Sequence, residues 1–161
     1  MNNAQKNVLY TKLCRFYGGV DNLRGKTIAL WGLSFKPNTD DMREAPSLVL
    51  IRGLFAAGAK VIAYDPVAAE EAMRMLVAEH GAAACDAQLT LVKSARAALA
   101  GADALVLVTE WKEFRAPDFS HLAATLRDKA VFDGRNIYQP GTVAAAGLHY
   151  EGIGRTSRAA A

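Results

Sequence analysis

The sequence predicts a three-layer α/β/α domain built around a mainly parallel sheet. Short apolar runs alternate with longer amphipathic segments along the 161 residues, and strands that alternate with helices pair in parallel because each helix provides the crossover. The runs are apolar almost throughout, as expected of strands buried on both faces. Hydrophobic residues make up 52% of the chain and charged residues 22%, a balance that supports a packed core and excludes wholesale disorder.

A helix over residues 2–16 is the first predicted element. Its apolar side chains recur at helical spacing, and the paired glycines at positions 18–19 end it. No capping residue followed by an acid precedes it, so the segment is typical of the back half of a longer helix. The residues on its apolar face are Ala4, Val8, Leu9, Leu13 and Phe16.

Strands and helices then alternate to the end of the chain. The first strand reads TIALWGL, and the helix after it carries Pro46 near its first position, where the missing N–H costs nothing. The last residues, RTSRAAA, are predicted to form a loose tail. Strands are predicted over residues 27–33, 60–64, 89–92, 104–108 and 130–132, with an edge strand over 149–153. Helices are predicted over residues 46–57, 68–79, 94–100 and 119–126.

Charge and cysteine content exclude several classes of protein. The 19 Lys and Arg against 16 Asp and Glu leave a net charge of +3, too small and scattered for a nucleic-acid or membrane surface. The N-terminus lacks the apolar core of a secretory signal, and no apolar stretch is long enough to span a bilayer. Cys14 and Cys85 form no CxxC pair. We therefore expect a soluble cytoplasmic domain without a zinc site, with both cysteines in the core and Cys85 in a loop.

Cationic side chains follow two of the predicted strands. Ligands of open parallel sheets bind outside the carboxyl ends of the strands. Lys36 and Arg43 follow the first strand, and Arg135 follows the fifth. A crevice that receives these cations suits an anion with several charges, such as a diphosphate. The alternative is that they pair with nearby acids, namely Asp40, Asp41, Glu44 and Asp133.

The usual signatures of a cofactor or catalytic site are missing from the sequence. Gly32 stands where a dinucleotide fingerprint begins, but GLSFK is not GxGxxG, so the glycine cradle for a pyrophosphate is lacking. Asp65 reads as an Asp-Pro turn residue rather than as the acid that holds a ribose. Asp40 and Asp41 are expected to cap the next helix and pair with Arg43. The three histidines show no metal-ligand spacing, and neither cysteine lies beside a base.

Four segments carry a resemblance to a known family. They are GLSFKPNTDDMREAPS at residues 32–47, YDP at 64–66, VTEWKEFR at 108–115 and FDGRNIYQP at 132–140. Together they resemble the C-terminal, Rossmann-like domain of the UDP-glucose 6-dehydrogenases, within the UDP-glucose/GDP-mannose dehydrogenase family. The first segment is similar across nucleotide-sugar dehydrogenases, whereas TEWKEF and DGRNIY favour the UDP-glucose members. The resemblance runs in order from about residue 2 to residue 155.

The resemblance implies a two-domain enzyme of which this chain is the C-terminal fragment. In that family a long central helix joins two Rossmann-like domains, and the enzyme oxidises the C6 alcohol of UDP-glucose to UDP-glucuronate, a precursor for polysaccharide biosynthesis, with two NAD⁺. The N-terminal domain carries the glycine fingerprint, the thiol nucleophile and the bases, none of which occurs here. Residues 1–18 then form the end of the central helix, residues 19–155 the UDP-binding domain, and residues 156–161 a flexible tail. Alone, the chain is expected to be inactive.

The resemblance also assigns roles to individual residues. Phe35 and Lys36 resemble the pair that contacts the UDP-sugar, and Arg135 resembles the arginine of the same site. Arg43 resembles an arginine that reaches NAD held by the N-terminal domain. The expected partners are that domain, UDP-glucose or UDP-glucuronate, and a second copy bound through the central helix. Trp31 and Ala45 depart from the family pattern, which has a smaller aliphatic residue and a serine at these positions.

Three other interpretations remain open. The nearest is another nucleotide-sugar dehydrogenase, acting on GDP-mannose or a UDP-N-acetylamino sugar. A receiver-type signalling module is a second, but it needs an aspartate after the third strand, where the chain has Val-Lys-Ser, and a lysine after the fifth, where it has Arg135. The third is a nucleotide-binding or dimerisation module that acts on its own.

Overall fold

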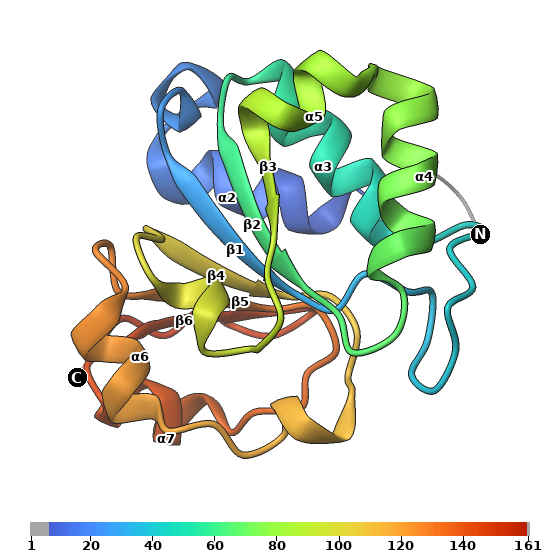
Figure 1. The fold of residues 1–161 in the computed structure, drawn as a ribbon. Coiled ribbons are helices and arrows are strands. Elements are labelled where there is room, and N and C mark those ends of the chain that lie inside the picture. The colour runs from blue at the N-terminus through green and yellow to red at the C-terminus, as the bar shows by residue number, and fades with distance from the viewer. Residues whose placement is uncertain (1–6, 161) are drawn as a thin grey trace.

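A six-stranded parallel sheet forms the centre of the molecule (Figure 1). The computed structural model describes residues 7–160. The strand order is β3-β2-β1-β4-β5-β6, and every neighbouring pair is parallel, which confirms the predicted fold class. The strands are β1 (Thr27–Trp31), β2 (Lys60–Tyr64), β3 (Leu89–Leu91), β4 (Ala104–Leu107), β5 (Ala130–Asp133) and β6 (His149–Gly152).

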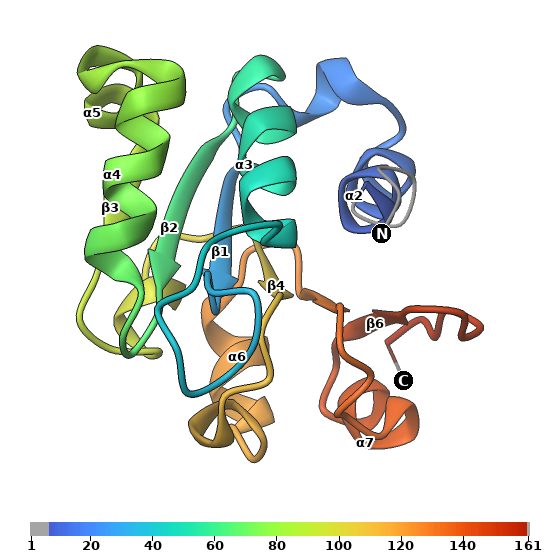
Figure 2. The same cartoon turned by 90° about the vertical axis from the view of Figure 1, so that its right-hand side faces the viewer.

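Helices cover both faces of this sheet, giving the three predicted layers (Figures 1 and 2). A short 3₁₀ turn, η1 (Val20–Leu23), connects the first described helix to β1. One face carries α2 (Val8–Tyr17), α3 (Pro46–Ala56), α4 (Ala69–His80) and α5 (Ala82–Gln88). The other carries the 3₁₀ turns η2 (Ala97–Leu99) and η3 (Lys112–Phe114) and the helices α6 (Phe119–Thr125) and α7 (Pro140–Ala145).

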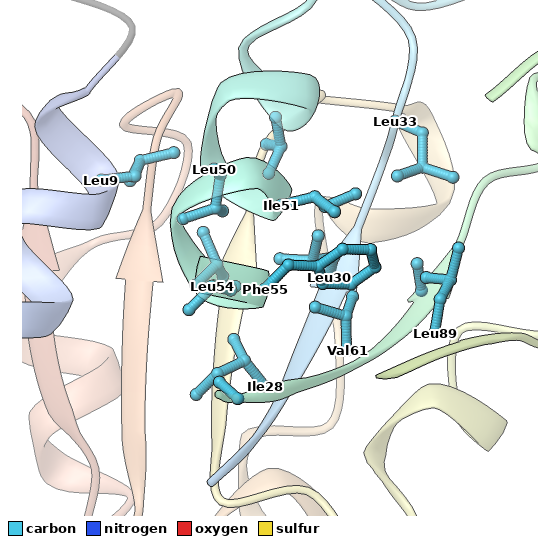
Figure 3. Close-up of a cluster of buried hydrophobic side chains, with 14 of the residues drawn as sticks. Leu9, Ile28, Leu30, Leu33, Leu50, Ile51, Leu54, Phe55, Val61 and Leu89 are labelled. Atoms are coloured by element: carbon cyan, nitrogen blue, oxygen red, sulfur yellow. The ribbon is translucent and has the colours of Figure 1, made fainter. Parts of the chain in front are cut away.

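The central strand β1 explains the unbroken apolar pattern of its sequence. Ile28 and Leu30 point into the core under α3, whereas Ala29 and Trp31 point into the core on the α6 side. All four are buried, so neither face of the strand calls for a polar residue. Figure 3 shows the first of these cores, where α3 places its leucines and Ile51 over β1.

The predicted element boundaries need several corrections. The first strand ends at Trp31 rather than at residue 33, because Gly32 turns the chain with φ +93°. The helix predicted over residues 94–100 is only the 3₁₀ turn η2, closed by a hydrogen bond from Leu99 N–H to the Arg96 carbonyl. Helices α5 and α7 lack a clear apolar stripe in the sequence and were not predicted. Cys85 therefore lies buried within α5, not in a loop.

The first and last segments of residues 7–160 pack against the rest of the domain. The helix predicted over residues 2–16 is present as α2, and its residues before position 7 lie outside the described part of the structure. Leu9 and Leu13 of α2 are buried against the domain. Arg158, in the segment predicted to be a tail, pairs with Tyr150 through two backbone hydrogen bonds of 2.8 and 2.9 Å. No helix among the described residues is both long and apolar enough to cross a membrane.

Candidate functional site

The carboxyl ends of β1, β4 and β5 form the candidate site. Strand order reverses between β1 and β4, the point at which open α/β sheets bind ligands. The register aligns Trp31 with Leu107 and Leu107 with Asp133, so the three strands end in one row. The loop after β1 (residues 32–45) carries Phe35, Lys36 and Arg43, and the loop after β5 carries Arg135. Both loops border the segment that follows β4, residues 108–118.

Asp65, directly after β2, anchors the start of the β1 loop. Its side chain is buried and accepts hydrogen bonds through Oδ2 from the backbone N–H groups of Leu33 (2.7 Å) and Ser34 (3.1 Å). Through Oδ1 it accepts from Val67 N–H (2.8 Å) and Ala68 N–H (2.7 Å), at the start of α4. The expected turn role is therefore present, but the same carboxylate also fixes the loop that carries Lys36.

Further hydrogen bonds hold this loop against its neighbours. The Thr109 hydroxyl donates to the Ser34 carbonyl and the Ser47 hydroxyl to the Leu33 carbonyl, each at 2.6 Å. Gly32 is required at its position, because a Cβ there would lie 2.5 Å from Cβ of Thr109. The base of the loop is thus fixed, while Phe35 and Lys36, which directly follow it, are exposed to solvent.

Arg135 lies on the loop after β5, and the side chain of Asp133 fixes the backbone of this loop. Asp133 is fully buried and accepts hydrogen bonds from the backbone N–H groups of Arg135 (3.1 Å) and Tyr138 (2.9 Å) and from the hydroxyl of Tyr150 (2.9 Å). The guanidinium of Arg135 instead pairs with Glu110, after β4. Asp133, the partner expected from the sequence, binds only the backbone of Arg135, and the pairing with Glu110 was not predicted. The Arg135 side chain keeps 41% of its surface exposed, so it remains accessible to an anion.

Arg43 pairs within its own loop. It donates from Nε and Nη2 to the two carboxylate oxygens of Asp41, both at 3.1 Å, and this hydrogen-bonded pairing lowers the pKa of Asp41 to about 2. With Asp41 it lines a polar groove of about 520 Å³ against Glu71 and Arg74 of α4. This groove lies on the β2 side of β1, whereas Arg135 follows β5 on the other side. The structure therefore separates Arg43 from Arg135.

The predicted helix cap at the acid pair is wrong in part. The pairing of Asp41 with Arg43 is confirmed. However, α3 is preceded by Ala45 at its N-cap, without a side-chain hydrogen bond, so neither Asp40 nor Asp41 caps it. Asp41 instead accepts from the backbone N–H of Arg43 at 2.9 Å. The acid therefore shapes the loop rather than the helix.

The described residues do not fit a dinucleotide at the usual place. Dinucleotide-binding sheets hold the pyrophosphate on free N–H groups of the turn after the first strand and on the following helix N-terminus. Here Asp65 already accepts from the N–H groups of Leu33 and Ser34. The helix begins only at Pro46, which has no N–H to offer. NAD therefore has no cradle in this turn.

Several residues of the segments TEWKEF and DGRNIY make hydrogen bonds that hold the site together. Trp111 donates from Nε1 to Asp65 at 3.1 Å, and the hydroxyl of Tyr138 donates to the carbonyl of Phe114 at 2.6 Å. Glu110 and Trp111 lie directly after β4, where the sequence places candidate site residues, but their contacts with Arg135 and Asp65 were not predicted, and Tyr138 was not singled out. For Glu110 and Trp111 the signal is their position directly after β4, the neighbour of β1 at the switch point, whereas Tyr138 lies five residues beyond the end of β5. Across residues 7–160, no three His, Cys, Asp or Glu side chains come together as a metal site.

Comparisons with known proteins converge on one family. Residues 29–140 match the UDP-binding domain of the UDP-glucose/GDP-mannose dehydrogenase family. The UDP-glucose 6-dehydrogenase of Pseudomonas aeruginosa is 49% identical over 154 residues, which cover 96% of this chain and 33% of that protein. The enzyme of the same name from Rhizobium meliloti is 40% identical over 155 residues, again 96% of this chain and 33% of the relative.

A solved structure supports the same relationship. The UDP-glucose dehydrogenase of the archaeon Pyrobaculum islandicum superposes with a TM-score of 0.74 at 30% identity, covering 96% of this chain and 31% of that one. The chain thus spans about a third of the length of the curated relatives that it matches.

Proposed function

Since this chain belongs to the UDP-glucose/GDP-mannose dehydrogenase family and forms its UDP-binding domain, we propose that it binds the UDP part of UDP-glucose within a UDP-glucose 6-dehydrogenase. The observation that carries the proposal is the placement of Lys36 and Arg135. Both are cations on fixed loops at the carboxyl ends of β1 and β5, on either side of β4. A lysine supplies a mobile point charge and an arginine a planar fork, a combination suited to the several oxygens of a diphosphate.

Phe35 completes the proposed substrate contact. It precedes Lys36 near the start of the loop and is 36% exposed, one of the few large apolar side chains at the surface of the described residues. An exposed ring beside a cation offers an apolar face to the planar base or to a sugar ring. Its backbone N–H bonds to the Asp41 carbonyl at 2.8 Å, which holds the tip of the loop closed.

The whole enzyme is proposed to oxidise the C6 alcohol of UDP-glucose to the carboxylate with NAD. The thiol, the bases and the NAD cradle belong to the N-terminal domain in this proposal. Cys85 is buried in α5 and Cys14 is half-buried on α2, so neither has the exposure of a reactive thiol. The purified chain is therefore expected to form no NADH from UDP-glucose above a blank without protein. NADH formation by the chain would contradict this division of labour.

Arg43 is proposed to act across the interface with the N-terminal domain. Its side chain is 87% exposed and paired with Asp41, so a partner that brings a phosphate can take it over at little cost in desolvation. We also propose that α2 continues the central helix, that this helix joins two copies of the enzyme, and that the enzyme works in the cytoplasm. The two free cysteines fit a reducing compartment.

Calorimetric titration of UDP into Lys36→Ala and Arg135→Ala tests the proposal. Each charge-assisted hydrogen bond contributes about 1.5–3 kcal/mol, so each variant should bind roughly ten- to a hundred-fold more weakly. Lys60→Ala is the matched control. Lys60 is an exposed lysine at the amino end of β2, whereas the proposed site lies at the carboxyl ends of the strands. Equal affinity of all three variants and the original chain would show that Lys36 and Arg135 serve only local ion pairs.

A further inference from the structure

We infer that Asp65 is a positioning residue for the UDP site: its carboxylate takes the place of a bound pyrophosphate in the turn after β1 and thereby sets the loop that carries Phe35 and Lys36. The inference rests on the proposed function for its UDP part. Asp65 itself is buried beneath the loop and is proposed to act through Lys36 rather than to touch the nucleotide.

The geometry around Asp65 is that of an anion site. Five N–H groups from three separate segments point at the two oxygens, at 2.7–3.1 Å. Two belong to the turn after β1, two to the start of α4, and one to the indole of Trp111 after β4. Convergent N–H donors at the carboxyl ends of parallel strands are what such sheets otherwise use to hold a ligand phosphate. Here the protein supplies the anion from its own chain.

The position of Asp65 in the sequence supports this reading. In dinucleotide-binding sheets the acid after the second strand faces the ribose, and the turn after the first strand keeps its N–H groups for the pyrophosphate. Asp65 occupies the position of that acid, yet its carboxylate reaches the turn instead. The α3 helix begins late, at Pro46, and so leaves the turn without a helix N–H. The carboxylate of Asp65 thus occupies the place that a ligand pyrophosphate takes in dinucleotide-binding sheets. The rest of the loop is then free to bind another ligand.

A short chain of hydrogen bonds connects Asp65 to Lys36. Ser34 donates its backbone N–H to Asp65 and its hydroxyl to the Lys36 carbonyl, the latter at 2.9 Å. The Ser34 carbonyl in turn accepts from Thr109. Ser34 is fully buried, so these bonds are shielded from water. The backbone of Lys36 is therefore fixed through one residue by the carboxylate of Asp65.

Asp103 offers a matched control for a purely structural role. It is another buried aspartate beside β1, and it accepts the backbone N–H of Thr27 at 2.8 Å. It lies at the amino ends of the strands, whereas Lys36 lies at their carboxyl ends. A substitution of Asp103 removes a buried carboxylate of similar burial but leaves the β1 loop untouched.

The experiment compares UDP affinity and urea unfolding for Asp65→Asn, Asp103→Asn and Ser34→Ala. Asp65→Asn and Ser34→Ala should weaken UDP binding about tenfold by loosening a preorganised loop. Asp103→Asn should lower stability but leave UDP affinity within about twofold. In Asp65→Ala, formate has the size of the missing carboxylate and should restore UDP affinity, whereas chloride at equal ionic strength should not. Unchanged affinity in Asp65→Asn, or equal loss in Asp103→Asn, would overturn the inference.

Two arms keep this test separate from that of the proposed function. If the original chain binds no UDP, the proposed function fails, and hydrogen exchange of the amides of residues 33–36 then decides the role of Asp65 alone. The exchange rate of these amides should rise in Asp65→Asn and stay unchanged in Asp103→Asn. Equal exchange rates in the two variants would refute the positioning role. If the Asp65 variants do not fold, Ser34→Ala decides, and a Ser34→Ala chain that binds UDP like the original overturns the inference.

Discussion

The guanidinium of Arg135 donates from Nε to Oε2 of Glu110 at 2.5 Å, joining the segment after β5 to the segment after β4. A contact through Nε fixes the plane of the guanidinium. The end-on edge of the fork, Nη1 and Nη2, can then engage two oxygens of a phosphate. Glu110 is only 17% exposed on its side chain, so it holds the arginine from the protein side. This position therefore suits an arginine, which can pair with Glu110 through Nε and still present Nη1 and Nη2 to a ligand.

Arg135→Lys should weaken UDP binding almost as much as Arg135→Ala, because an ammonium cannot pair with Glu110 and present a planar fork at once. Lys36→Arg, by contrast, keeps a mobile cation on an exposed loop and should cost little. Titration of UDP into the three variants measures the difference. An Arg135→Lys chain that binds UDP like the original would show that only the charge matters here.

Gly32→Ala should destabilise the fold more than Gly81→Ala. Both glycines have positive φ, +93° and +89°, and a side chain at such a φ costs of order 1–3 kcal/mol. At Gly81 a Cβ meets nothing within 4 Å, whereas at Gly32 it would collide with Thr109, adding about 1–3 kcal/mol of overpacking. Urea unfolding of both variants gives the comparison. Equal losses would mean that β1 and the Thr109 segment can separate without cost.

All five tyrosines should resist ionisation while the chain is folded. Burial raises the pKa of each above its ordinary value of 10.0, and for Tyr64 burial and a hydrogen bond with Glu113 raise the pKa to about 12. A folded pKa above the unfolded one gives stability that is fully present below pH 10.0 and lost as the pH rises through the folded value. Absorbance titration of tyrosinate alongside circular dichroism should therefore show ionisation only above pH 10.0. Glu113→Gln should lower the pKa of Tyr64. Tyrosinate near pH 10.0 in an intact fold would contradict these burial assignments.

Arg43→Ala should leave UDP affinity unchanged and release Asp41. The pKa of Asp41, held at about 2 by Arg43, should return toward its ordinary value of 3.8 in the variant. The lowered folded pKa means that this ion pair contributes above pH 3.8 and is lost as the pH falls through 2. Carboxyl titration by NMR measures the pKa. In the whole enzyme the same variant should lower kcat/KM for NAD; a loss of UDP affinity equal to that of Lys36→Ala would contradict the separate roles.

The sheet was predictable from sequence because a strand buried on both faces must be apolar almost throughout, and β1 and β4 show that pattern. The short helices α5 and α7 were not, since they have too few turns to show a stripe. The placement of the cations after β1 and β5 followed from the chemistry of parallel sheets. The ion pair of Arg43 with Asp41, two residues away, was also predictable. The contacts of Arg135 with Glu110 and of Ser34 with Asp65 were not, because the residues of each pair lie far apart in the sequence. Each pair comes together only because the strands that precede its two residues lie side by side in the folded sheet.

The most direct test of the account is an NMR titration of the isotope-labelled chain with UDP. At 17.2 kDa, the chain gives a resolved amide signal for most residues. UDP should shift signals in residues 33–44, 108–115 and 133–139, at the carboxyl ends of β1, β4 and β5, and Lys36→Ala and Arg135→Ala should reduce the shifts. GDP should cause smaller changes at equal concentration. Shifts centred on the opposite edge of the sheet, around Thr27 and Asp103, or no shifts at all, would contradict the claim that this edge binds UDP.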